Sequence, residues 1–267
     1  MSDVVLMEVR DQVAVITLNR PERLNAWTPA LQTRYFDLLD ECAAREDVRV
    51  IVVTGAGRGF CAGADMEALQ SLMGDGGAGN GAGAEAAIAP DARPVRHPLS
   101  IPKPVIAAIN GPCAGIGLVL ALMCDIRFAA ASAKITTAFS RRGLVAEHGI
   151  SWMLPRLIGP ARALDLLFSS RVILGAEAAE LGLVNRALDS DVLEFALEYA
   201  RELARECSPA SMATMKRQVY ADFERPLPNA VDEANQLMGE SFAKPDFAEG
   251  VQSFLERRSP SFAPLAG

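Results

Sequence analysis

Two short segments rich in glycine and alanine contain the residues of this sequence that are best suited to chemistry. The first runs over Phe60–Met66 (FCAGADM) and the second over Asn110–Gly117 (NGPCAGIG). Small side chains let a ligand approach the backbone closely, and the first N–H groups of a helix have no partner within the helix. Two such turns that converge on one carbonyl oxygen would stabilise an enolate, an effect of roughly several kcal/mol.

Each turn taken alone also has a plain structural explanation, because glycine-rich turns between a strand and a helix are common. Neither turn contains the G-x-G-x-x-G fingerprint of dinucleotide-binding proteins, and neither has the lysine of a Walker phosphate loop. We therefore expect no dinucleotide or nucleoside triphosphate here. We expect Asp65 to cap a helix that begins after the first turn.

The elements around the turns follow the pattern of an α/β protein, in which sites form where strands end. Apolar runs predict buried strands over Val48–Thr54 and Val105–Ile109, and a helix follows the second strand over about Gly115–Met123. Further predictions are a hairpin of Val4–Val9 and Val13–Leu18, a helix from Thr28-Pro29 to about Arg45, and a strand at Ile126–Ala129.

From about Asp191 onward the sequence predicts helices alone. Their predicted ranges are Val192–Glu206, Pro209–Phe223, Asn229–Phe242 and Asp246–Arg258. Several are apolar on one face, so they must cover a core or another subunit. Residues 73–90 are low in complexity and rich in glycine and alanine. They form either a surface loop or a mobile lid over a pocket.

Composition excludes several classes of function. The chain has 267 residues, a net charge of −7, five scattered cysteines and two histidines. An acidic chain without a basic cluster is not expected to bind nucleic acid, and this cysteine and histidine pattern predicts neither disulfides nor a metal site. The N-terminus does not resemble a signal peptide, and no apolar run is long enough to span a bilayer. We therefore expect a cytoplasmic protein without membrane partners.

The order of motifs along the chain resembles the crotonase family, the enoyl-CoA hydratases and isomerases. The motifs are N-R-P-x-x-x-N-A (Asn19–Ala26), F-C-A-G-A-D-M, K-P-V-I-A-A-I-N-G, M-C-D-I-R-F-A and E-G-V-Q-S-F-L-E-R-R (Glu249–Arg258). The resemblance implies an α/β spiral of ββα turns over residues 1–195. It also implies a helical trimerisation region over 196–267, packed on the core and on neighbouring subunits of a homotrimer or a dimer of trimers.

The same resemblance implies the ligand and part of the site. The substrate would be an acyl-CoA thioester, with coenzyme A as part of the substrate and no permanently bound cofactor. Ala64 and Ile116 fall on the two backbone oxyanion donors. Coenzyme A contacts would fall on Arg23, Leu24, Ala26, Ala62, Asp65 and Met66, and on Phe254 and Arg257 of a neighbouring subunit. An alternative for Arg257 is a solvated helix end that complements the dipole.

The carboxylates bear on which reaction of the family this chain performs. Hydratases of the family use two glutamates, and alignment on M-C-D places Val119 and Phe139 at those positions. Neither side chain can polarise water or relay a proton, so ordinary hydratase chemistry is not expected.

One acidic residue remains in a suggestive place. The segment Phe139–Gly159 resembles F-x-x-x-G-L-x-P-[ED]-x-G of the single-acid isomerases, including the ring-opening isomerases of phenylacetate catabolism, and the acid falls on Glu147. Ala146 stands where many relatives have proline. We expect apolar neighbours to bury Glu147, and the adjacent His148 to point away from it. The structural alternative for Glu147 is a charge at the start of a helix over Gly149–Leu157.

Three functions remain open at this stage. The first is a 3-enoyl-CoA to 2-enoyl-CoA isomerase, in which Glu147 moves one proton while the oxyanion turns hold a dienolate. The second is a 2-enoyl-CoA hydratase of fatty-acid catabolism in which Glu147 alone activates water. The third is a non-catalytic protein that binds acyl-CoA.

Overall fold

A computed structural model describes residues 3–67, 70, 91 and 93–265 of the chain, so residues 73–90 lie outside the described part. The main sheet has the strand order β1-β2-β3-β4-β6-β9, and a small sheet has the order β5-β7-β8. The strands are β1 (Val5–Arg10), β2 (Val13–Leu18), β3 (Val50–Gly55), β4 (Val105–Ile109), β5 (Cys113–Ala114), β6 (Ile126–Ala130), β7 (Lys134–Thr136), β8 (Ile173–Leu174) and β9 (Arg186–Leu188). The β1–β2 hairpin is antiparallel and the rest of the main sheet is parallel.

The central strand β3 is buried along its whole length because helices cover both faces of the main sheet. Ile51 and Val53 belong to the core cluster that includes α1 (Pro29–Ala44), whereas Val50 and Val52 belong to the cluster that includes α8 (Val192–Glu206). A strand alternates its side chains between the two faces. The continuous apolar run predicted as a doubly covered strand is therefore confirmed.

Local capping signals fix two of the long helices where the sequence predicts them. The Thr28 side chain accepts a hydrogen bond from the Leu31 N–H at 3.3 Å, and Pro29 begins α1. Asp191 caps α8, whose bounds agree with the prediction. The predicted division at residues 195 and 196 falls inside α8, and α8 packs on β3 and β4. That division of the chain into two regions remains a prediction.

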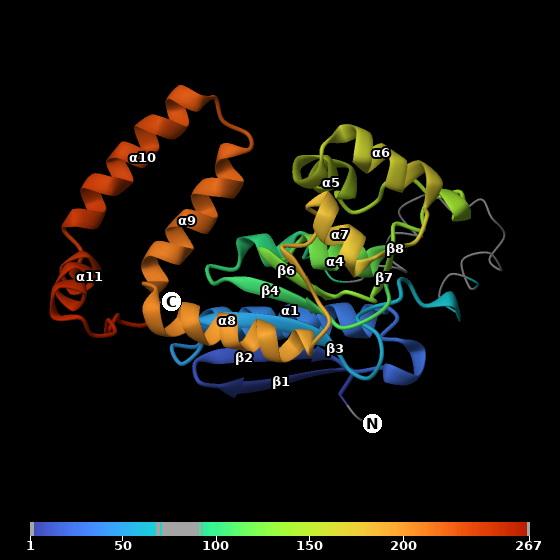
Figure 1. Ribbon diagram of the computed structural model, residues 1–267, viewed down its shortest axis with the longest axis horizontal. Helices are drawn as coiled ribbons and strands as arrows, with labels where there is room; N and C mark the ends of the chain where they lie inside the picture. The colour runs from blue at the N-terminus through green and yellow to red at the C-terminus, as the bar shows by residue number, and fades with distance from the viewer. Residues whose placement is uncertain (1–2, 68–69, 71–90, 92, 266–267) are drawn as a thin grey trace.

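The described chain has further short helices between β2 and α8, and three longer helices follow α8. They are η1 (Pro21–Arg23), η2 (His97–Ser100), α4 (Ile116–Leu122), η3 (Ser140–Arg142), α5 (Ile150–Ile158), α6 (Pro160–Ser169), α7 (Gly175–Leu181), α9 (Pro209–Asp222), α10 (Leu227–Phe242) and α11 (Pro245–Glu256). Figure 1 shows α9, α10 and α11 extending away from the sheet as a separate group. Asp125 fastens α9 to the core through Lys216, at 2.8 Å, and the Tyr220 hydroxyl, at 3.0 Å.

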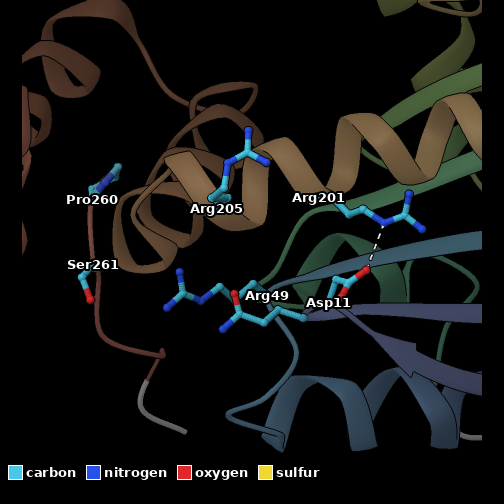
Figure 2. A pocket seen from close by; sticks show the side chains of 7 residues that line it. Asp11, Arg49, Arg201, Arg205, Pro260 and Ser261 are labelled. Atoms are coloured by element: carbon cyan, nitrogen blue, oxygen red, sulfur yellow. Dashed lines mark ion pairs between the residues drawn. The ribbon is translucent and has the colours of Figure 1, made fainter. Parts of the chain in front are cut away.

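A pocket of about 550 Å³ lies near the amino ends of β2 and β3, lined by Asp11, Gln12, Arg49, Arg201, Arg205, Pro260 and Ser261 (Figure 2). Two of its arginines make contacts that hold separate parts of the fold together. Arg49 donates to the carbonyl oxygens of Ala204 at 2.9 Å and Phe262 at 2.6 Å, and Arg201 lies 3.4 Å from the Asp11 carboxylate. These contacts join the end of α8 and the C-terminal tail to the sheet. The glycine-rich turns follow the opposite, carboxyl ends of the strands, roughly 20 Å away for a six-residue strand.

Candidate active site

The first turn presents the backbone N–H of Ala64 on the side that faces away from Trp27. Trp27 and Ala64 form a parallel β-bridge in which Trp27 N–H donates to Gly63 O at 2.8 Å and Asp65 N–H donates to Trp27 O at 3.0 Å. This pattern uses the polar groups on either side of Ala64 and leaves those of Ala64 pointing the other way. Within the described residues, the Ala64 N–H has no backbone acceptor.

The second turn presents the first N–H groups of α4. Gly115 precedes the helix with φ +52° and ψ −122°, a conformation suited to glycine, and its carbonyl accepts from Leu118 and Val119. Ile116 and Gly117 begin the helix, so their N–H groups have no partner inside it. No described residue offers the Ile116 N–H a backbone acceptor either. The dipole of this helix end favours negative charge.

Close contacts hold the two turns against each other. Cys61 and Cys113 form a parallel β-bridge, and a Cβ added to Gly117 would lie 2.2 Å from the Cys61 carbonyl oxygen. A Cβ added to Gly115 would lie 4.0 Å from the Gly63 Cα. The donors predicted from sequence, Ala64 and Ile116, therefore belong to neighbouring backbone segments. Two backbone N–H groups that converge on one oxygen can stabilise an enolate.

The Asp65 carboxylate holds the first turn in place through hydrogen bonds. Its Oδ1 accepts from the Glu67 N–H at 3.0 Å, and Met66 and Glu67 are helical, so the predicted cap is confirmed. Its Oδ2 accepts from Arg20 at 2.9 Å, and Arg20 also donates to the Ala26 carbonyl at 2.6 Å. Burial alone would raise the pKa of Asp65, but the hydrogen bonds from Arg20 and Glu67 outweigh it and hold that pKa below its usual value.

The residues predicted to contact coenzyme A near the first turn lie together in the structure. Leu24 O accepts from the Ala62 N–H at 3.0 Å, and Arg23 pairs with Glu67 at 2.7 Å. Met66 is 55% exposed beside them. Arg23 and Glu67 are also exposed, so a ligand phosphate can reach the guanidinium.

The two C-terminal residues that were predicted to contact coenzyme A lie on or directly after α11, outside the first turn. Phe254 lies on α11 and is 83% exposed, and Arg257 ends that helix in a left-handed conformation with φ +55°. Among the residues that the structure describes, neither forms a hydrogen bond or an ion pair with the Arg23 region of the same chain. Arg257 follows Glu256, the last residue of α11, which is the position expected for the alternative of a solvated helix end.

Apolar side chains fill the two positions that the motif alignment matches to the hydratase glutamates. Val119, on α4, is fully buried, and Phe139, which precedes η3, is 5% exposed. Both belong to the main core cluster. The described chain therefore has no carboxylate at either position.

Glu147 lies in the turn that leads into α5, and α5 packs against α4. Its carbonyl accepts from the Ile150 N–H at 3.1 Å, so α5 begins one residue after the predicted start. The predicted burial is wrong for the single chain, because the Glu147 side chain is 32% exposed. Two of its expected apolar neighbours, Leu144 and Val145, are 40% and 76% exposed.

Sequence reasoning missed two residues that shape the first turn. Trp27 is the bridge partner of Ala64, and its indole donates to Gln32 at 3.1 Å. Asn25 is fully buried with φ +56°, and its side chain bonds Arg20 N–H, Ala56 O and Gly59 O. The spacing of Asn25 within N-R-P-x-x-x-N-A was a signal for it, whereas the role of Trp27 depends on a contact distant in sequence.

The described residues hold neither a candidate metal site nor a candidate membrane span. No group of three or more potential ligand side chains there is placed to hold a metal ion. No described helix is long and apolar enough to cross a membrane.

The chain is similar to known proteins over almost its whole length. A family model described as enoyl-CoA hydratase/isomerase matches residues 8–264. A probable enoyl-CoA hydratase of Rhodobacter capsulatus is 40% identical, with 96% of each chain covered. The 1,2-epoxyphenylacetyl-CoA isomerase of Escherichia coli is 35% identical over 98% of this chain and 99% of its own.

Solved structures agree with the α/β fold. A probable enoyl-CoA hydratase/isomerase from Mycobacterium abscessus superposes with a TM-score of 0.87 at 30% identity, covering 98% of this chain and 99% of its own. The family inferred from the sequence motifs is thus confirmed together with its fold. The chain belongs to the enoyl-CoA hydratase/isomerase family, the crotonase superfamily.

Proposed function

We propose that this enzyme moves a carbon–carbon double bond of an acyl-CoA thioester from position 3 to position 2, with Glu147 as the proton shuttle. The observation that carries the proposal is the set of side chains at three positions. Val119 and Phe139 fill the hydratase positions with buried apolar groups, and Glu147 places a carboxylate ahead of α5. One acid suffices for isomerisation, whereas hydration in this family uses two.

The proposed reaction conserves protons and needs no cofactor. The N–H groups of Ala64 and Ile116 donate to the thioester oxygen. The Glu147 carboxylate removes a proton from C2, and the C–H electron pair enters the conjugated dienolate. The carboxylic acid then returns the same proton to C4, and the double bond is left between C2 and C3. The negative charge on oxygen is held by the two donors throughout.

The same proposal assigns binding of the coenzyme A part to the Arg23 region. Arg23 is exposed and pairs with Glu67 through one terminal nitrogen, so a phosphate can replace that carboxylate. Leu24, Ala26, Ala62 and Met66 supply backbone and apolar surface beside it. Asp65 positions the turn through its contacts with Arg20 and Glu67.

A panel of enoyl-CoA thioesters tests the reaction type. We expect 3-enoyl-CoA to give 2-enoyl-CoA, seen as a rise in the absorbance of the conjugated thioester and as a product of unchanged mass. The panel should include the 1,2-epoxyphenylacetyl-CoA of the Escherichia coli relative. Micromolar binding by calorimetry without turnover of any thioester would contradict an enzymatic role and favour the binding-only function.

Hydration of 2-enoyl-CoA is the second candidate. The Rhodobacter capsulatus relative is named a probable enoyl-CoA hydratase, and the 32% exposure of the Glu147 side chain lets water reach it. Hydration would lower the conjugated absorbance and add the mass of water to the product. The same mass-spectrometric screen therefore separates the two reactions.

The proposal also includes a homotrimer or a pair of trimers. A groove of about 820 Å³ between α9, α10 and α11 is lined mainly by apolar side chains, among them Met215, Met238, Phe247 and Phe254. No residue of α10, which the structure describes in full, is buried. Light scattering should give three or six times the mass of the chain. A monomer would contradict both the trimer and the supply of Phe254 and Arg257 to a neighbouring site.

A further inference from the structure

His148 adopts a backbone conformation that turns its side chain toward Glu147. Its φ of +55° lies in the left-handed region, which is costly for a residue with a Cβ, and Gly149 follows with φ +82°. The sequence expectation that these adjacent side chains point apart is therefore wrong. The His148 Nε2 lies 3.8 Å from the Glu147 Oε2.

The distance and the burial define what this contact can do. At 3.8 Å the two atoms are too far apart for a direct hydrogen bond, but they are close enough for attraction between charges or for a bridging water. The two side chains are 25% and 32% exposed, so the contact is partly shielded from solvent. Backbone strain of this kind is found preferentially at functional sites.

We propose that His148 is the positioning residue of Glu147, and this inference rests on the proposed function. The imidazole faces one carboxylate oxygen, Oε2. In this proposal Oε1 takes the proton from C2 and returns it to C4. His148 itself gains and loses no proton in this cycle. It holds the carboxylate in one orientation while the proton is delivered to a different carbon, a task in which misplacement of a group is costly.

His148→Gly removes the imidazole at the position where glycine is best tolerated. Glycine adopts positive φ without strain, so the variant should fold. We expect kcat for 3-enoyl-CoA isomerisation to fall about tenfold while KM changes less than about twofold. Imidazole added at millimolar concentration should restore at least about a third of the lost kcat, because it can occupy the vacated space.

Two further variants complete the test. His97→Gln changes the other histidine, which pairs with Asp40 at 2.7 Å, and should leave kcat unchanged. Glu147→Gln should be slow and should not respond to imidazole, because the group that His148 positions is gone.

The possible results separate the two proposals. A His148→Gly enzyme with unchanged kcat, or a slow one that imidazole does not restore, overturns the role of His148 and leaves the proposed function standing if Glu147→Gln is slow. Full activity of Glu147→Gln overturns both proposals. Rescue of His148→Gly together with a slow Glu147→Gln supports both.

Discussion

Glu147→Gln should lower kcat for conversion of 3-enoyl-CoA to 2-enoyl-CoA by at least about 10²-fold, with KM changed less than about threefold. The amide has the size and shape of the carboxylate, so it preserves packing ahead of α5. It cannot accept a proton from carbon at neutral pH. The loss therefore falls on the proton-transfer step, and initial rates followed by conjugated-thioester absorbance measure it.

A matched substitution separates this effect from a general loss of negative charge. Glu180 is an exposed glutamate on α7, and Glu180→Gln makes the same chemical change away from the site. It should leave kcat and KM unaltered. If Glu147→Gln were as active as Glu180→Gln, the base of the reaction would lie elsewhere in the chain.

The long elements were predictable because each carries its own local signal. The β4 strand and α8 have the predicted bounds, since glycine, proline or an acidic cap marks their ends and an apolar pattern fills their length. The strands β5, β7 and β8 span two or three residues each. Such strands are too short to show a period, so only the folded chain reveals the small sheet.

The candidate site was predictable to the extent that backbone chemistry follows residue type. The glycines of both turns and the cap at Asp65 could be inferred, because small residues and helix starts have defined conformations. The orientation of Glu147 relative to His148 could not be inferred, because it depends on a left-handed backbone angle at a histidine. The support of Ala64 by Trp27 joins residues that no local pattern links.

The contact between the two turns leads to the second large expected effect. Gly117→Ala should lower kcat by about 10²-fold and the free energy of unfolding by about 1–3 kcal/mol. The new methyl would meet the Cys61 carbonyl oxygen at 2.2 Å and the Cys61 Cβ at 2.8 Å, so α4 and the first turn must separate. The proposed convergence of the Ala64 and Ile116 N–H groups on one oxygen would then be lost. Rates and thermal unfolding measure the two losses.

A second glycine in a helix shows whether the effect comes from this contact. Gly239 lies within α10, and an added Cβ there meets no atom within 4 Å. Gly239→Ala should stabilise the fold by about 0.5–1 kcal/mol and leave kcat unchanged, because alanine favours a helix interior. If a folded Gly117→Ala protein instead kept full kcat, the spacing of the turns would not control the reaction. If it bound acyl-CoA normally but turned over slowly, the lost interaction would be one made in the transition state, which is what an oxyanion site requires.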